Sequence, residues 1–379
     1  MKTKIIILGA GLVGKPIALD LANDSDFKVT AADIDKAKLR AIKEKGLRKI
    51  QADLSSSREL RGLVNDYDIV VNAVPGFMGY KCLRNCIEAG KDVVDIAFYP
   101  EDVFGLSELA KVNDVRVISD MGVAPGMSNL LVGEAVEKLD HVTNVDIYVG
   151  GLPKLRNLPW EYKAVFSPAD VIEEYTRPAR LVENGKIVSK AALTEIELLE
   201  FDKPGTLEAF NSDGLRSLMF TIKADNMREK TLRYPGYAEK IKLLESNGFF
   251  SNKKVDVGGQ KVSPLDLTSK LLFEHWKLEE NEADLTIMRI IVEGTVSGKT
   301  MRYTYDLYDE FHARSGIHSM ARTTGYTATM AVRLLAEGLY KETGITVPEY
   351  LGKDKKIVRF MLRGLKKRGV VYKSLVEEL

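Results

Sequence analysis

Short apolar runs rich in β-branched residues recur along the first 120 residues, separated by stretches with helical spacing. They predict strands at residues 4–8, 28–33, 48–52, 69–74, 92–97 and 115–119, with helices between them. Continuous apolar runs are typical of parallel strands that are covered on both faces. The pattern therefore predicts an α/β domain with a doubly wound parallel sheet.

The pattern changes after about residue 140. Strands at 145–149, 186–189, 287–294 and 299–308 show alternation or antiparallel pairing, and residues 295–298 are predicted to form a hairpin turn. These elements indicate a second, mixed α+β domain.

Helical spacing returns toward the C-terminus. Residues 324–327 are expected to start a helix over 328–342, and a basic helix follows at 355–368. The apolar positions of the first helix are Met330, Leu334, Leu335 and Leu339. We expect this helix to return to the parallel sheet and make the first domain discontinuous.

A glycine-rich turn follows the first predicted strand. It contains Gly9, Gly11, Leu12, Val13 and Gly14. Glycine permits the tight turn, the close approach of a pyrophosphate and the packing of helix on strand, while the helix N-terminus attracts phosphate. Asp33, which ends the second strand, is expected to accept hydrogen bonds from the adenosine ribose. Its charge would repel a 2′-phosphate, so the pattern predicts a Rossmann domain that prefers NAD to NADP.

An S-adenosylmethionine site is the main rival, because it also uses a glycine turn and an acidic residue. The fourth strand favours the dinucleotide, since it leads into a segment expected to pass the nicotinamide ribose. That segment is Asn72, Ala73, Val74 and Pro75. Asp53 is expected either near the adenine or as a turn carboxylate.

Composition excludes several classes of function. The net charge of +1 gives no electrostatic reason to expect nucleic acid or an anionic membrane as a partner. The two cysteines and four histidines lack metal-ligand spacing, so we expect no metal. No apolar run reaches the roughly 18 residues of a membrane span, and we expect a cytoplasmic protein.

Several motifs resemble the saccharopine dehydrogenase family. They are GAGLVG at 9–14, NAVPGF at 72–77, VDIAF at 94–98 and DMGVAPGMSN at 120–129. Further segments resemble its lysine 6-dehydrogenase branch: GGLP at 150–153, FSP at 166–168, EEYTRPAR at 173–180, SDGLRS at 212–217, TLRYPG at 231–236 and RTTGYTA at 322–328. The resemblance implies a Rossmann domain at 1–123 with about 325–379, and a substrate-binding and dimerisation domain at 124–324.

The resemblance also implies a reaction and a partner. NAD would take a hydride from the ε-carbon of L-lysine, and the imine would hydrolyse to ammonia and a semialdehyde that cyclises to piperideine-6-carboxylate. A homodimer is expected. Such chemistry needs a base near the nicotinamide, and Asp120, at the mouth of the last parallel strand, is the candidate. Its alternative role is to cap the turn that follows. That turn is expected to be an interdomain hinge or to present helix amides to a ligand.

The substrate's carboxylate and ammonium need charged partners. Candidates beyond residue 140 are Tyr162, Asp213, Arg216, Arg233 and Arg322. Asp213 and Arg216 would lie one turn apart on a helix, or else form a structural ion pair. Tyr237 departs from relatives that carry histidine there, which weakens the lysine assignment if that position touches substrate. Alternatives are a saccharopine dehydrogenase or reductase, a condensing dehydrogenase of the carboxynorspermidine type, and a catalytically silent NAD sensor.

Overall fold

The computed structural model describes residues 2–164, 168–279 and 281–379. Residues 166 and 167 of the FSP motif lie outside the described residues. The chain divides into two compact units, Met1–Glu134 with Ala321–Val370 and Ala135–Met320 with Val371–Leu379. The first unit is therefore built from both ends of the chain.

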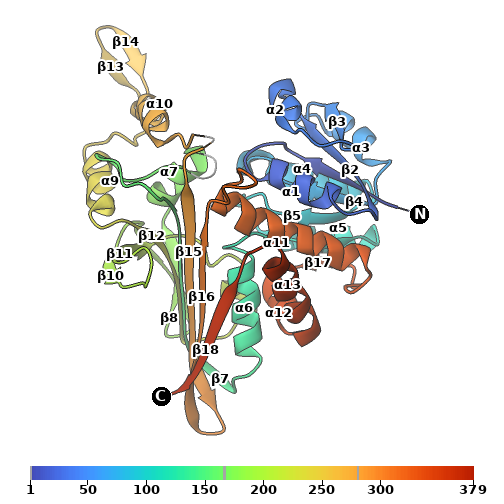
Figure 1. The fold of residues 1–379 in the computed structure, drawn as a ribbon. Coiled ribbons are helices and arrows are strands. Elements are labelled where there is room, and N and C mark those ends of the chain that lie inside the picture. The colour runs from blue at the N-terminus through green and yellow to red at the C-terminus, as the bar shows by residue number, and fades with distance from the viewer. Residues whose placement is uncertain (1, 165–167, 280) are drawn as a thin grey trace. The chain divides into compact units, whose positions relative to one another are not determined.

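The described part of the first unit contains a seven-stranded parallel sheet in the order β17-β6-β5-β4-β1-β2-β3 (Figure 1). Its strands are β1 (Thr3–Leu8), β2 (Phe27–Asp33), β3 (Arg48–Gln51), β4 (Ile69–Asn72), β5 (Asp92–Asp95), β6 (Arg116–Ile118) and β17 (Gly344–Thr346). The strand order reverses between β1 and β4, and ligands of doubly wound sheets bind at this switch point.

Helices follow most strands of this sheet. They are α1 (Gly14–Ala22), α2 (Lys36–Ala41), α3 (Ser57–Val64), α4 (Gly76–Glu88), the 3₁₀ turn η1 (Val103–Leu106), α5 (Ser107–Val112), α12 (Pro348–Gly352) and α13 (Lys355–Lys367). Two more, α6 (Met127–Val136) and α11 (Ser319–Ala336), run across the boundaries between the units.

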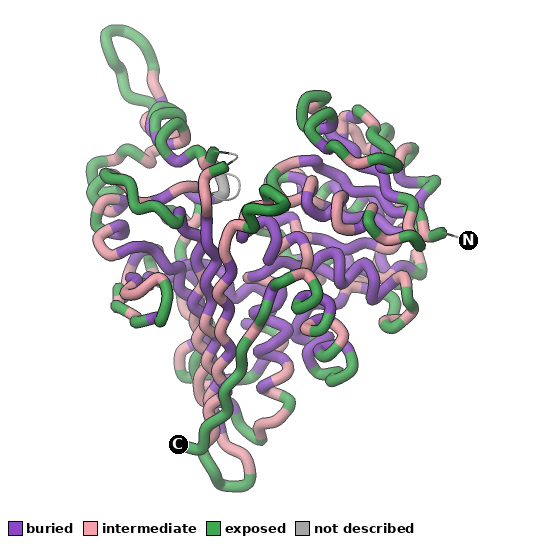
Figure 2. Tube along the Cα trace, in the orientation of Figure 1, coloured by how far each residue is buried: buried purple, intermediate pink, exposed green. Residues whose placement is uncertain are grey.

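Apolar side chains cover both faces of the parallel sheet. Ile6 and Leu8 pack with residues of α3, α4 and α5, including the buried Cys82 and Cys86. Ile7 points to the opposite face because side chains alternate along a strand, and there its Cγ2 lies 3.6 Å from the position of a Cβ on Gly14 of α1. Apart from the edge strand β3, which is mostly exposed, the strands are accordingly buried along most of their length (Figure 2).

The second unit contains, among its described residues, a nine-stranded sheet whose main path is β10-β11-β12-β7-β15-β16-β18. Its strands are β7 (His141–Pro153), β8 (Ala179–Glu183), β9 (Lys186–Lys190), β10 (Glu197–Leu199), β11 (Leu207–Asn211), β12 (Asn226–Arg233), β15 (Asp284–Val296), β16 (Lys299–Glu310) and β18 (Tyr372–Glu378). A small hairpin and four helices complete it: β13 (Val255–Val257), β14 (Gln260–Val262), α7 (Pro168–Thr176), α8 (Leu218–Thr221), α9 (Tyr237–Ser246) and α10 (Pro264–Trp276).

The predicted fold class is confirmed. Each of the first six parallel strands begins within one residue of its predicted position. The predicted hairpin is β15–β16, whose turn is only Ser297-Gly298; both residues have positive φ values, 51° and 80°. Such a two-residue turn matches the right-handed twist of the strands.

The predicted helix at 328–342 was wrong at both ends. Helix α11 starts at Ser319 and runs through the threonine- and glycine-rich segment that suggested a start signal. Thr327 is buried and its hydroxyl donates to the carbonyl of Thr323, so these polar groups are satisfied inside the helix. The helix then stops before Gly338, whose φ is +65°, and Leu339 is exposed.

The C-terminal segment also differs from the expected division. Residues 372–378 were assigned to the nucleotide-binding domain, but they form β18, which pairs with β16 in the second unit. No helix in the described ranges is long and apolar enough to cross a membrane.

Candidate functional site

Three glycines shape the turn between β1 and α1. Gly9 has a φ of +102°, and a Cβ there would lie 2.4 Å from the carbonyl oxygen of Ala73. A Cβ on Gly14 would lie 2.0 Å from the carbonyl oxygen of Gly9. A Cβ on Gly11 would meet nothing within 4 Å. The fold therefore requires Gly9 and Gly14, whereas Gly11 borders open space where a ligand can approach the backbone.

The start of α1 suits a phosphate. The helix begins with no side-chain cap at Val13, and Leu12 is exposed at the tip of the turn. Uncapped amides and the positive end of the helix dipole together attract anions. The turn and helix thus fit the pyrophosphate of a dinucleotide.

Asp33 lies directly beside this turn. Its Oδ2 accepts a hydrogen bond of 2.8 Å from the amide of Ala10, and its Oδ1 accepts one of 2.8 Å from the amide of Asp35. Each carboxylate oxygen can accept a second hydrogen bond. The carboxylate is therefore fixed where ribose hydroxyls would donate, and the exposed Ile34 offers an apolar surface next to it.

The segment after β4 touches the glycine turn, but not through its asparagine. Asn72 is wholly buried, and its Nδ2 donates to the carbonyl of Gly79 and to Oδ1 of Asp95. The amide of Ala73 donates to the carbonyl of Leu8, and Pro75 is exposed. Ala73 and Pro75 thus reach the surface beside the turn, while the Asn72 side chain, like buried Val74, supports the loop from within.

Asp53 acts as a turn carboxylate. It accepts hydrogen bonds from the amide and the hydroxyl of Ser55, and these bonds lower the pKa of Asp53. The structural alternative is confirmed, and contact with adenine stays a prediction.

Asp120 follows β6 in a conformation that is rare for a residue other than glycine. Its φ is +54°, and only 5% of its surface is exposed. Backbone strain of this kind is found at active sites, where the surrounding structure holds it in place. The turn after it is closed internally, because the amides of Met127 and Ser128 donate to Gly122 and Val123. The expected presentation of these helix amides to a ligand was therefore wrong.

A buried tyrosine lies near Asp120. The Tyr99 hydroxyl donates to Oδ2 of Asp95 over 2.7 Å and lies 3.3 Å from the hydroxyl of Ser119. Burial, with the negative charges of Asp95 and Asp120, raises the pKa of Tyr99 well above its usual range. Polar groups from the carboxyl ends of β5 and β6 thus converge with Asp120 at one end of the sheet.

In the second unit, Arg233 lies inside an aromatic cluster. Its guanidinium carbon is 4.5 Å from the ring centre of Tyr162 and 5.8 Å from that of Tyr237, and its Nη2 donates to Glu174 and Tyr175. Within the described part of the chain, Nε of Arg233 and the hydroxyl of Tyr162 have no hydrogen-bond partner. The structure therefore brings these two predicted substrate residues together.

The other candidates do not contact the guanidinium of Arg233 in the described hydrogen bonds and ion pairs. Asp213 forms a two-pronged ion pair with Arg180, both N–O distances being 2.9 Å. Residues 213–216 are not helical, so the expected helical turn between Asp213 and Arg216 was wrong. Arg322 belongs to the first unit, where it donates to the carbonyl of Arg368 over 3.0 Å. Its predicted substrate role has no support in these contacts.

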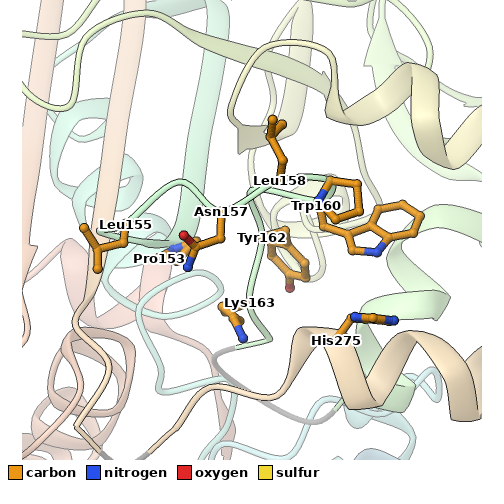
Figure 3. Close-up of a pocket in the computed structure, with 9 residues that line it drawn as sticks. Pro153, Leu155, Asn157, Leu158, Trp160, Tyr162, Lys163 and His275 are labelled. Carbon is orange, nitrogen blue, oxygen red and sulfur yellow. The ribbon is translucent and has the colours of Figure 1, made fainter.

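A pocket of about 160 Å³ opens in the second unit, and Tyr162 is in its wall (Figure 3). Its lining residues are Pro153, Leu155, Asn157, Leu158, Pro159, Trp160, Tyr162, Lys163 and His275. The aliphatic and aromatic walls suit methylene groups, and the lysine, asparagine and histidine suit a carboxylate. No cluster of metal-ligating side chains is present among the described residues.

Two protein-family models match the chain. The model of the saccharopine dehydrogenase NADP-binding domain matches residues 5–118, and that of the saccharopine dehydrogenase C-terminal domain matches residues 122–370. The chain belongs to the saccharopine dehydrogenase family. The predicted family is thus confirmed, and the glycine turn lies within the residues that match its NADP-binding domain.

Curated relatives carry dehydrogenase or synthase names. The chain is 26% identical to saccharopine dehydrogenase [NADP(+), L-glutamate-forming] of Pyricularia oryzae, over 79% of this chain and 70% of the relative. It is 24% identical to carboxyaminopropylagmatine dehydrogenase of Synechocystis, over 96% of both. The bovine mitochondrial alpha-aminoadipic semialdehyde synthase is 23% identical over 98% of this chain, which spans about half (47%) of that protein.

The apo saccharopine dehydrogenase (L-Glu forming) of Saccharomyces cerevisiae has the same fold. Its structure superposes with a TM-score of 0.82 at 20% identity, covering 99% of this chain. The fold likeness to that protein thus extends over both units of this chain.

Sequence reasoning missed the network around Tyr99 and the pocket residues Trp160 and His275. Asp95 and Ser119 carried a usable signal, because each stands where a parallel strand ends. Trp160 and His275 carried none, since they are brought together by a fold that joins distant parts of the chain.

Proposed function

We propose that this protein catalyses the NAD-dependent oxidative deamination of the ε-amine of L-lysine. The observation that carries the proposal is the glycine turn with Asp33 fixed beside it. Such a site suits a dinucleotide whose adenosine ribose carries no 2′-phosphate. The dehydrogenase names of the relatives support an oxidoreductase.

NAD supplies the hydride acceptor when bound. The chain's own residues hold it: Gly11 leaves room for the pyrophosphate, the start of α1 neutralises it, and Asp33 accepts from the ribose. With Ile34 and Asp35 after Asp33, no cation directly follows the acid to receive a 2′-phosphate.

Asp120 is the proposed base. Its carboxylate takes a proton from the ε-ammonium, because only a neutral amine can release hydride from the adjacent carbon. The imine then adds water and releases ammonia, leaving the semialdehyde. Burial and the charge of Asp95 keep the Tyr99 hydroxyl protonated. Its hydrogen bond to Asp95 stabilises the end of β5 near Asp120.

Within the second unit, the pocket at Tyr162 is proposed to bind the amino-acid group of L-lysine. Lys163, which donates to the carbonyl of Lys277 over 3.0 Å and lies 3.6 Å from a carboxylate oxygen of Glu282, would pair with the α-carboxylate in place of Glu282. Trp160 would cover the methylene chain. Replacing Lys163 would then weaken the affinity of the protein for L-lysine and leave kcat unchanged.

The test is formation of NADH with L-lysine and with saccharopine at matched concentrations, together with the Asp120→Asn variant. Asparagine tolerates positive φ, so the variant should fold. We expect activity on lysine with release of ammonia, and a loss of about 100-fold or more in kcat for Asp120→Asn. An Asp120→Asn enzyme with wild-type kcat would remove Asp120 from the mechanism.

Saccharopine oxidation is the second candidate, because two relatives are named saccharopine dehydrogenase. Activity on saccharopine alone, with release of glutamate, would replace lysine as the substrate. NAD binding without activity on either compound would favour a condensing dehydrogenase or an NAD sensor.

A further inference from the structure

Phe77 is the most exposed large apolar side chain among the described residues of the first unit. It lies in the first turn of α4, and 88% of its surface is exposed. A single exposed apolar residue is common on protein surfaces, so its neighbourhood decides whether it has a role. Two sets of contacts fix the place of this first turn.

The loop that leads into α4 contacts the glycine turn. The amide of Ala73 donates to the carbonyl of Leu8 over 2.9 Å. The carbonyl oxygen of Ala73 lies so close to Gly9 that a Cβ there would be 2.4 Å away. Phe77 therefore follows, by four residues, a segment packed directly on the dinucleotide turn.

The next turn of α4 contacts the segment that follows β5. A Cβ on Gly79 would lie 2.6 Å from Cβ of Ala97 and 2.7 Å from Cδ1 of Tyr99. The Tyr99 hydroxyl in turn lies 3.3 Å from the hydroxyl of Ser119 at the end of β6. The turn that carries Phe77 thus stands between the glycine turn and the strand ends next to the proposed base.

The strand order assigns this place to one half of a dinucleotide. Asp33 ends β2 and is proposed to bind the adenosine ribose, and β2 and β4 flank β1 on opposite sides. A dinucleotide that crosses the switch point therefore has its nicotinamide half on the β4 side. Exposed apolar side chains occur on both sides and between them, at Ile34 after β2, at Leu12 in the glycine turn and at Phe77 after β4.

We propose that Phe77 packs against the nicotinamide ring of the bound cofactor. This inference rests on the dinucleotide site of the proposed function. An aromatic side chain offers a large apolar surface to a flat ring, and its face attracts the positive charge of the oxidised nicotinamide. Phe77 is thus a positioning residue for the ring, whereas Asp33 and the glycine turn bind the rest of the cofactor.

Calorimetric titration of the full-length protein with NAD and with ADP-ribose tests the proposal. ADP-ribose contains the adenosine, the pyrophosphate and the second ribose, but it lacks the nicotinamide ring. We expect Phe77→Ala to bind NAD about tenfold or more weakly, and ADP-ribose within about twofold of wild type. Because the side chain is exposed, this variant should fold as wild type does.

Val112→Ala is the matched control. Val112 is 82% exposed and ends α5, which runs back from the end of β5 to the start of β6. It therefore lies at the opposite edge of the sheet, and its variant should bind both compounds as wild type does. Phe77→Tyr keeps the aromatic ring and should retain most of the affinity for NAD.

The titrations separate a failure of this inference from a failure of the cofactor site. Wild-type NAD affinity in Phe77→Ala, or an equal loss of affinity for NAD and ADP-ribose, would overturn the role of Phe77 and leave the dinucleotide site in place. A wild-type protein that binds neither compound would remove the dinucleotide site, and the role of Phe77 with it.

Discussion

Asp33 combines a structural and a recognition role in one carboxylate. It accepts hydrogen bonds from the amides of Ala10 and Asp35, and these bonds connect the glycine turn to the end of β2. Its negative charge is held in place by these two bonds rather than by a cation. A 2′-phosphate would therefore meet an uncompensated carboxylate.

Asp33→Ala should change cofactor preference more than it changes affinity for NAD. We expect the dissociation constant for NAD divided by that for NADP to rise by about tenfold or more. The variant loses a charged hydrogen bond to NAD and also loses the repulsion of the 2′-phosphate of NADP. Calorimetric titration with each nucleotide measures this without any substrate. Asp35→Ala, which removes the N-cap of α2, is the control and should leave the ratio unchanged.

Glu229 is a residue whose environment decides its charge. Burial, reinforced by Glu174 and Asp213 and opposed by Arg216, raises the pKa of Glu229 to about 8 from 4.5. The folded chain thus holds a proton that the unfolded chain has released, and stability contributed by this group is lost as pH rises from about 4.5 to about 8.

Glu229→Gln should remove that pH dependence, because glutamine keeps the shape without the charge. We expect the variant to be more stable than wild type at about pH 9 and closer to it at about pH 5. Urea unfolding at the two pH values measures the difference. The exposed Glu239→Gln is the matched control; a Glu229→Gln curve as steep as the wild-type curve would contradict the assignment.

At the scale of elements, different glycines of the β1–α1 turn are expected to serve folding and binding. Gly14 is required by contact with Gly9, whereas Gly11 faces open space. Substitutions at the two positions should therefore have different consequences.

Gly14→Ala should lower the unfolding midpoint, because its Cβ would meet a backbone oxygen. Gly11→Ala should unfold near the wild-type midpoint and still bind NAD at least about tenfold more weakly. Thermal unfolding and nucleotide titration of both variants test this. Normal NAD affinity in Gly11→Ala would place the pyrophosphate elsewhere.

The secondary-structure elements differ in how well the sequence predicts them. The parallel strands were predictable because their apolar runs reflect burial on both faces, and the turn because each glycine has its own steric reason. Helix α11 was misjudged because Thr323 and Gly325 are typical of turns, yet here they pack against other parts of the first unit. Strand β18 was missed because its side chains are mostly exposed, so its pattern carries no burial signal.

The candidate site was predictable where one local segment makes it. Asp33 and the glycines are local, and the structure places Asp33 beside the turn, while its contact with ribose stays a prediction. The ion pair of Asp213 with Arg180 and the aromatic cluster around Arg233 join segments far apart in sequence. No local pattern could reveal those partners.

At the scale of the molecule, the first unit is closed by contacts between remote parts of the chain. Asp20 of α1 accepts from Arg333 of α11 over 2.9 Å and from Arg368, after α13, over 2.8 Å. All three side chains are largely buried. One carboxylate thus binds both C-terminal helical segments to the nucleotide-binding half.

Asp20→Asn should destabilise the protein by about 3 kcal/mol, because it leaves two buried cations with less compensation. Denaturant unfolding measures the loss. Asp26→Asn, an exposed carboxylate in the following loop, should cost less than about 0.5 kcal/mol. Equal costs for the two variants would show that the contacts of Asp20 contribute nothing.

The chain passes between its units at Glu134, Met320 and Val370, and this route governs how the protein is made. During translation the glycine turn and Asp33 emerge early, but Arg333 and Arg368 follow some three hundred residues later. β18 completes the other unit later still. A nascent chain halted before Arg333 has neither unit finished, so a stop codon at that point would damage both.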